Sequence, residues 1–229
     1  MYLVANFGYK GYSAGMFRAS LTSPERVARQ IRERILAGRY PGGTILRQEE
    51  LAAELGVSRM PVREALRQLA AEGLLILHPH RGAVVAELSL AELEEIYEMR
   101  AALEPLALRL AIPRLGKGQL GEAEDALDEA ERVHDGQRLS QLNWRFHAAL
   151  YRPAERPRLL STIELLHLNV DRYMRMILTV MQHREQSNLE HRLLLEACRA
   201  REVERASRLL QQHILEAGQR LVQFLKEKV

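Results

Sequence analysis

Apolar positions between residues 51 and 73 recur with the period of two short helices separated by a tight turn. Gly56 is suited to the left-handed backbone that ends the first helix. Ser58 is the expected N-cap of the second helix, and Pro61 fits its first turn, where a missing N–H does no harm. The two apolar faces are formed by Leu51, Ala52 and Leu55, and then by Val62, Leu66 and Leu69.

The second of these helices carries basic residues on its polar side. Arg59, Arg63 and Arg67 recur every fourth residue, starting at the helix N-terminus. Arginines placed in this way suit phosphates and guanine edges in the major groove of duplex DNA, so the segment is predicted to be a helix-turn-helix. The alternative is an ordinary solvated face, in which the arginines pair with Glu64 or Glu72.

Two β-prone runs follow directly, at residues 74–77 and 83–85, and they predict a hairpin. The loop between them, residues 78–82, contains a proline, an arginine and a glycine. A hairpin placed after a recognition helix is a wing, and its basic tip can reach the adjacent groove or the DNA backbone. The pattern therefore predicts a winged helix-turn-helix.

From residue 89 onward the pattern is helical. Ser89 and Glu92 have the spacing of a capping box, so a long helix is expected to begin there. Short connections between helices favour an antiparallel bundle. The predicted fold is mainly α: an N-terminal winged helix-turn-helix with a small β-hairpin, then a C-terminal all-α antiparallel helical bundle. The bundle helices are expected at residues 89–112, 118–134, 138–151, 155–182, 187–200 and 202–227.

Three segments are expected along the chain. Residues 1–22 are rich in glycine and tyrosine without periodicity, and we interpret them as a flexible leader. Residues 23–86 form the predicted DNA-binding domain, whose first helix opens at Ser23 with proline next to it. Residues 87–229 form the predicted effector-binding and dimerisation domain. The linker is short, so the two domains should be closely coupled.

Charge is distributed unevenly between the two halves. Residues 1–88 hold 12 Lys/Arg against 8 Asp/Glu, whereas the remainder holds 21 against 22. The excess of basic residues lies with the recognition helix, as nucleic-acid binding requires. A single cysteine, Cys198, excludes an intramolecular disulfide framework. No apolar run approaches the roughly 20 residues that span a bilayer. A cytoplasmic protein is expected.

Motifs between residues 41 and 82 resemble the DNA-binding domain of GntR-type bacterial transcription regulators. They are residues 41–46 (PGGTIL), 50–52 (ELA), 57–66 (VSRMPVREAL), 72–74 (EGL) and 81–82 (RG). The resemblance implies that Arg59 and Arg63 contact bases or phosphates and that the wing approaches the minor groove. Met60 stands where the family usually has threonine, which bears on a phosphate contact or the preferred base. The expected DNA-interface residues are Arg47, Ser58, Arg59, Met60, Arg63, Arg67, His80, Arg81 and Gly82.

Three histidines and an asparagine are predicted to meet inside the bundle. Asn143 and His147 are four residues apart, so they share a helix face. His191 lies 10 residues before Arg201 and His213 lies 12 residues after it, so an antiparallel helix pair that turns near Arg201 brings them level. Three imidazoles and one side-chain oxygen from three helices suit a first-row transition metal.

Residues 90–227 resemble the FCD domain, the C-terminal effector domain of the FadR branch of GntR regulators. Residues 142–150 (LNWRFHAAL), 190–194 (EHRLL) and 212–213 (QH) carry the resemblance. Many FCD domains bind Zn²⁺, Ni²⁺ or Mn²⁺ through an aspartate, a histidine four residues later and two further histidines. The resemblance implies a divalent transition metal held by Asn143, His147, His191 and His213. Asn143 replaces the usual aspartate and is a poorer, neutral ligand, so a metal-free pocket is the alternative.

Effector binding is expected close to this centre. Arg100 matches an arginine that pairs with an effector carboxylate in several relatives, and a guanidinium offers a carboxylate a planar fork. The alternative is an (i, i+4) salt bridge to Glu104 on the helix surface. Arg172 and Tyr173 are weaker candidates for the same role. The remaining histidines are expected to be ordinary core or surface residues: His78, His134, His167 and His183.

The predicted function is a ligand-responsive transcription regulator, a repressor, that binds a palindromic operator as a homodimer. The expected effector is a small organic acid bound beside the metal. One alternative is a constitutive DNA-binding protein whose helical domain only dimerises. The other is a metal-dependent hydrolase, against which the sequence offers no well-placed carboxylate base beside the histidines. We therefore expect no enzymatic activity.

Overall fold

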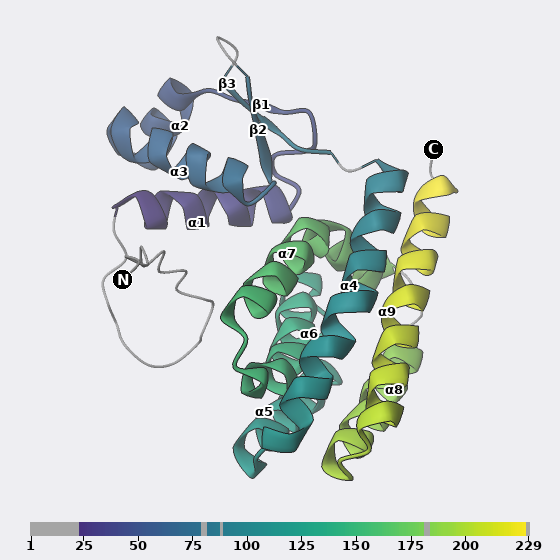
Figure 1. Cartoon of the computed structure of the whole chain (residues 1–229). Helices are drawn as coiled ribbons and strands as arrows, with labels where there is room; N and C mark the ends of the chain where they lie inside the picture. The colour runs from purple at the N-terminus through teal and green to yellow at the C-terminus, as the bar shows by residue number, and fades with distance from the viewer. Residues whose placement is uncertain (1–22, 79–81, 88, 181–183, 228–229) are drawn as a thin grey trace, which may run out of the picture.

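The computed structural model describes residues 23–78, 82–87, 89–180 and 184–227, and the predicted leader lies outside these ranges. They form an N-terminal winged-helix region followed by a helical domain, as the sequence predicted (Figure 1). The elements of the winged-helix region are α1 (Ser23–Leu36), β1 (Ile45–Leu46), α2 (Gln48–Leu55), α3 (Arg59–Ala71), β2 (Leu75–His78) and β3 (Gly82–Val85).

The helix-turn-helix consists of α2, a short turn and α3. Gly56 ends α2 with φ 64°, in the left-handed conformation that its position predicted. The apolar face of α3 is buried, including Val62, Leu66 and Leu69. It packs mainly on α1, which contributes Val27 and Ile31 to the same core cluster. Because this face is occupied by α1, the arginine-bearing face of α3 is directed outward.

The predicted hairpin is part of a larger antiparallel sheet with the strand order β1-β3-β2. In the hairpin, Leu75 pairs with Val85 and His78 pairs with Gly82. The additional strand β1 was not predicted, because it is only 2 residues long and follows a glycine-rich turn. It pairs with β3 and fixes the segment before α2 against the wing.

The helical domain contains six α-helices and two short 3₁₀ turns in the part of the chain that the structure describes. Ser89 and Glu92 form the predicted capping box at the start of the domain. Cys198 is buried in its core. The elements are α4 (Leu90–Ala111), η1 (Ile112–Arg114), α5 (Lys117–Ala130), α6 (Gly136–Tyr151), η2 (Arg152–Ala154), α7 (Pro157–Val180), α8 (Arg184–Arg199) and α9 (Val203–Lys226).

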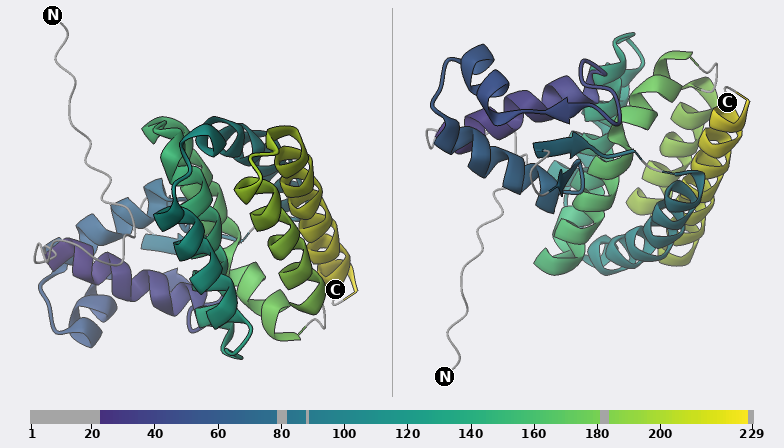
Figure 2. Two further views of the ribbon diagram at one scale, coloured as in Figure 1. Left: turned by 90° about the horizontal axis from the view of Figure 1, so that it is seen from below. Right: turned by 90° about the horizontal axis from the view of Figure 1, so that it is seen from above.

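The two parts of the chain lie side by side, with α1 facing α7 (Figures 1 and 2). Each part has its own cluster of buried apolar residues. In the helical domain, α4 packs along α9, α5 along α6, and α6 against α7. α8 also packs along α9 and against α5. The predicted histidines are carried by α6, α8 and α9. Among the described helices, none is both long and apolar enough to cross a bilayer.

Candidate DNA interface and metal centre

The recognition helix α3 exposes all three of its predicted DNA-contacting arginines, Arg59, Arg63 and Arg67. Arg59 pairs with Glu49 of α2 at 2.9 Å, and Arg63 donates a hydrogen bond to the sulfur of Met60 at 3.1 Å. Both contacts are on the surface, where they are weak and readily exchanged for phosphate contacts. The outward arginine face is therefore available to a DNA groove.

In the solvated-face alternative, Glu72 could pair with the recognition arginines. In the structure, Glu72 pairs with a different arginine. It forms a buried ion pair with Arg32 of α1, with nitrogen–oxygen distances of 2.6–3.0 Å. Gln68 also donates a hydrogen bond to the Glu72 carboxylate. A buried pair of this kind is costly to break, because either partner would remain charged and desolvated. Glu72 therefore fixes the end of α3 to α1.

The remaining predicted DNA-interface residues have different outcomes. Ser58 occupies the predicted N-cap position of α3, although its side chain makes no capping hydrogen bond. Met60 is 55% exposed, and Arg47 is exposed and pairs with Glu50. Gly82 begins β3 with φ +88°, and a Cβ built there would lie 3.1 Å from the carbonyl oxygen of Leu46. The wing residues His80 and Arg81 lie outside the described residues.

His147, His191 and His213 converge inside the helical domain. Their ligand nitrogens all lie within 4.8 Å of one another. The ring centroids of His191 and His213 are 4.5 Å apart, which agrees with their predicted positions at the same level of α8 and α9. His147 and His191 are buried, and His213 is partly exposed. The cluster is therefore accessible from one side.

The spacing of the cluster fits a shared metal ion. The Nε2 atoms of His147 and His191 are 3.2 Å apart. Two nitrogens bound to one tetrahedral Zn²⁺ at roughly 2.0–2.1 Å lie about 3.3 Å apart. Imidazole nitrogens are suitable ligands for zinc, nickel and related divalent ions. These three residues could therefore hold such an ion, which would supply a Lewis acid for an anionic ligand.

Neighbouring groups orient two of the imidazoles. Tyr151 donates its hydroxyl hydrogen to Glu104 at 2.7 Å, so its oxygen accepts the Nδ1–H of His147 at 3.0 Å. The Nδ1–H of His213 donates to Glu190 at 2.6 Å. In both rings this tautomer leaves the Nε2 lone pair free for a metal. Carboxylates and hydroxyls commonly orient metal-bound histidines in this way.

Burial keeps the inner imidazoles neutral. It lowers the pKa of both His147 and His191 well below the usual range, and the charge that His213 would carry adds to the effect. Burial opposes ionisation of Glu190, but hydrogen bonds from His213 and Gln186 outweigh it and lower the pKa of that carboxyl. Neutral imidazoles beside an ionised carboxylate are the protonation states that bind a metal cation.

Arg100 is buried and forms the (i, i+4) ion pair with Glu104, at 2.7 Å. The pair lies in the interior, not on the helix surface as the alternative assumed. Burial disfavours the guanidinium cation, but Glu104 outweighs this and raises the pKa of Arg100. The Nη1 atom of Arg100 has no hydrogen-bond partner among the described residues. Arg100 thus retains a donor for a further acceptor.

The other predicted residues lie in three different settings. Asn143 is partly exposed, one helical turn before His147 on α6. Tyr173 is partly buried and lines a cavity between the helical domain and the winged-helix region. The side chain of Arg172 lies outside what the structure describes. The assignment of these residues to metal or effector binding stays a prediction.

Sequence reasoning missed several residues of the site. Tyr151 follows His147 by four residues, and Glu190 directly precedes His191, so both were detectable as neighbours of a predicted ligand. His167 was expected to be an ordinary histidine. It is buried, it stacks on Trp144 with ring centroids 4.6 Å apart, and its Nδ1 has no hydrogen-bond partner among the described residues. Burial, reinforced by Arg100 and Arg175, lowers its pKa to about 3.

Comparison with known families agrees with this geometry. Residues 24–85 match the model described as "Bacterial regulatory proteins, gntR family", and residues 95–216 match the FCD domain. The chain belongs to the GntR family of transcription regulators. GntR regulators bind DNA operators and are not enzymes, which removes the hydrolase alternative. FCD domains often bind metal, in keeping with a histidine cluster that could hold one.

Relatives with related names span most of the chain. It is 31% identical over 192 residues to the uncharacterized HTH-type transcriptional regulator YdhC of Bacillus subtilis, covering 81% of this chain and 83% of the relative. It is 33% identical over 194 residues to the probable D-xylose utilization operon transcriptional repressor of Paenarthrobacter nicotinovorans, covering 82% and 85%. The solved structure of Escherichia coli McbR/YncC superposes with a TM-score of 0.78 at 25% identity, covering 90% of this chain and 99% of that one.

Proposed function

We propose that this GntR regulator is a cytoplasmic, ligand-responsive repressor that binds a palindromic operator as a homodimer. Its effector is a small organic acid bound beside a divalent transition metal in the helical domain. The observation that carries this proposal is the convergence of His147, His191 and His213 in the interior of a chain that also exposes a basic recognition helix. Such imidazoles are costly to bury without a ligand, which argues against a domain that only dimerises.

The contacts around the histidines support an anionic effector. Arg100 is linked to the cluster through Glu104 and Tyr151, which contacts His147. An effector carboxylate that accepted a hydrogen bond from Arg100 Nη1 would therefore join the series of hydrogen-bonded side chains that orients His147. Binding at this position would couple the ligand to the metal ligand set through direct contacts.

Exposed apolar residues support the homodimer. Met99 and Leu106 lie seven residues apart on α4 and are 38% and 43% exposed. Leu215 of the adjacent helix α9 is also exposed. Residues seven apart share a helix face, so α4 presents an apolar stripe to solvent in the single chain. A second copy packed on this stripe would place two recognition helices in one assembly, as a palindrome requires.

Elemental analysis of purified protein tests the metal centre. His147→Ala combined with His191→Ala is expected to remove the bound metal, and His213→Ala alone is expected to weaken binding at least about 100-fold. Asn143→Asp should strengthen binding, because it restores a negative charge beside the dication. His134→Ala, on an exposed loop residue, is the matched control. Equal metal content in the parent and the double variant would exclude this site.

A further inference from the structure

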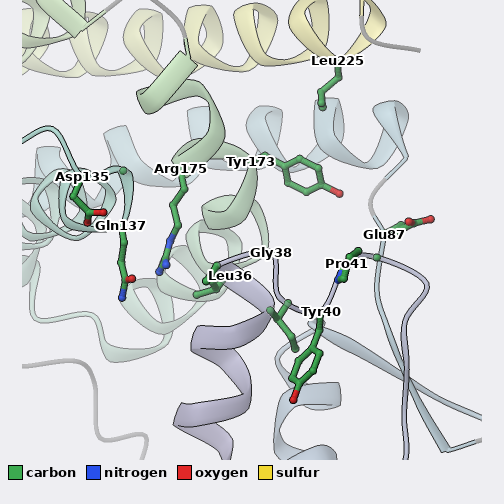
Figure 3. A pocket seen from close by; sticks show the side chains of 14 residues that line it. Leu36, Gly38, Tyr40, Pro41, Glu87, Asp135, Gln137, Tyr173, Arg175 and Leu225 are labelled. Atoms are coloured by element: carbon green, nitrogen blue, oxygen red, sulfur yellow. The ribbon is translucent and has the colours of Figure 1, made fainter.

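One contact between the two parts of the chain is centred on a carboxylate, that of Glu33 in α1. Gln137 of α6 donates a hydrogen bond to Glu33 Oε2 at 2.9 Å. Arg175 of α7 approaches the same oxygen, with its Nη1 at 3.7 Å. We call these three residues the interdomain latch. Figure 3 shows the side chains of Gln137 and Arg175 extending from the helical domain toward α1.

The helical side of the latch is held firmly. Arg175 donates to Asp171 from Nε at 2.9 Å, and its Nη2 lies 2.8 Å from the same carboxylate oxygen. Ser140 of α6 also donates a hydrogen bond to Asp171. Gln137, Ser140 and His147 all belong to α6. The latch is therefore anchored to the helix that carries the first histidine of the candidate metal centre.

The DNA side of the latch is equally firm. The residue before Glu33 is Arg32, which forms the buried ion pair with Glu72 at the end of the recognition helix. Adjacent residues of α1 thus contact α3 on one side and the helical domain on the other. Because the Arg32–Glu72 pair is buried and joined by three hydrogen bonds, α1 and α3 are expected to move as one body.

A second contact joins α7 to the end of the recognition helix. Gly73 follows α3 with φ +76°, and a Cβ built on it would lie 2.9 Å from Asn169 Oδ1. Leu168, the neighbour of Asn169, packs against the apolar core of the winged-helix region. The helical domain therefore contacts both α1 and the C-terminal end of α3, and it leaves the exposed arginine face of α3 uncovered.

A pocket that is open to solvent lies beside the latch. A cavity of about 670 Å³ opens between the two parts, bordered by Leu36 and Tyr40 on one side and Gln137, Tyr173 and Arg175 on the other (Figure 3). The Glu33 side chain is partly exposed, at 34%, so its contacts with Gln137 and Arg175 are weaker than those of a fully buried pair.

We propose that Glu33, Gln137 and Arg175 are positioning residues for operator recognition, which set the orientation of the recognition helix relative to the helical domain. This rests on the proposed dimeric operator complex, in which two recognition helices must enter successive major grooves together. With the latch closed, both helices are already oriented when the first one binds. With the latch broken, the second recognition helix can change its orientation until it binds. Binding then removes this freedom, and the entropy cost lowers the affinity for a palindrome.

Full-length protein and two duplexes test the proposal. The first is a palindromic site selected by the protein from a random library, and the second is the same duplex with one half-site scrambled. Fluorescence anisotropy gives the dissociation constant for each. Glu33→Ala is expected to weaken binding to the palindrome at least about fivefold, within the usual range of coupling between sites. Binding to the half-site duplex should change less than twofold, because the recognition helix itself is intact.

Further variants separate positioning from a direct effect on DNA. Gln137→Ala should also weaken palindrome binding. The effect of the double variant should be smaller than the sum of the two single effects, because both changes remove the same hydrogen bond. Glu33→Gln keeps an acceptor for Gln137 and should restore part of the affinity. Gln30→Ala, at an exposed position of the same helix, is the control. If Glu33→Ala acted only by removing a negative charge near the DNA, it would change the affinity for both duplexes equally.

Three outcomes would overturn the proposal. Equal weakening on both duplexes would assign Glu33 to DNA contact or to folding, and a rise in palindrome affinity would mean that the closed latch opposes binding. Unchanged affinity for both duplexes would leave the latch without a role in recognition. A parent protein that binds the palindrome no better than the half-site would instead contradict the dimeric operator complex, and with it the basis of this inference.

Discussion

At the residue scale, the histidine cluster depends on polar neighbours that lie four residues or fewer from a recognised position. Tyr151 and Glu190 fix the tautomers of His147 and His213. Glu104 joins Arg100 to Tyr151. Each partner sits on the same helix face as a residue that the pattern did identify, or beside one. A single buried chain of hydrogen bonds therefore connects the candidate effector residue with a candidate metal ligand.

His167 provides a pH-dependent contribution to stability. Its pKa is about 3 in the folded protein and 6.5 in the reference state, so the unfolded chain binds a proton that the folded chain rejects. The stabilisation is complete above pH 6.5 and is lost as the pH falls toward 3. Because His147 and His191 are also held neutral by burial, they add to this acid sensitivity with the same sign.

We expect the free energy of unfolding of the parent to fall by about 1 kcal/mol more than that of His167→Gln when the pH is lowered from about 7 to 5.5. Urea titrations at the two pH values, in the presence of a chelator, measure this difference. The exposed His134→Gln serves as the control and should behave like the parent. Identical pH dependence in the parent and His167→Gln would show that His167 is not held neutral.

At the element scale, most of the fold followed from apolar periodicity and capping signals. The two helices of the helix-turn-helix, the hairpin and the helices of the bundle were predicted near their observed positions. β1 was missed because a strand of 2 residues has no periodicity of its own and forms only by pairing with β3. Ser58 was correctly expected at the N-cap, but the residue type does not fix the side-chain rotamer, and no capping hydrogen bond forms.

The site was predictable only in part for a related reason. Spacing along helices places His147, His191 and His213 on facing surfaces, so their convergence followed from topology. Spacing along the helices cannot show which buried side chain lacks a hydrogen-bond partner, since that depends on packing between helices. His167 therefore resembled any other histidine in the sequence, although in the structure it is buried and stacks on Trp144 of α6.

A substitution at Arg63 tests the assignment of α3 as the recognition helix. Arg63→Ala is expected to weaken operator binding by about 1–3 kcal/mol and to reduce the salt dependence of binding if a phosphate contact is lost. Its side chain is exposed and contacts only the Met60 sulfur among the hydrogen bonds described, so the fold should be unaffected. Arg208→Ala, on the exposed side of α9, is the control. Unchanged operator affinity at physiological salt would contradict the assignment of α3.

At the scale of the whole molecule, α1 is the common support of the recognition helix and the helical domain. It packs on α3 through the core of the winged-helix region and faces α7 through the latch. On one side α1 contacts α3, which carries the exposed arginines, and on another it contacts α7 of the helical domain. A change in the positions of α6 and α7 would therefore reach the recognition helix through few intermediate contacts.

A substitution in the apolar stripe on α4 tests the proposed homodimer. Leu106→Glu is expected to convert a dimer into a monomer, because it places a charge in the centre of the proposed interface. Sedimentation velocity measures the change directly. Leu189→Glu is a matched control, since Leu189 is a similarly exposed leucine on α8, outside the stripe. A Leu106→Glu protein that remains a dimer would place the interface elsewhere on the molecule.

The operator dissociation constant, measured with and without an effector, tests the account most directly. A thermal-shift screen of small organic acids on metal-loaded protein identifies the acid that stabilises it most. Anisotropy titrations of the selected palindromic duplex then follow with and without that acid. We expect the dissociation constant to rise at least about fivefold when the acid is present. A stabilising acid that leaves operator affinity unchanged would contradict the claim that the histidine site controls the recognition helix.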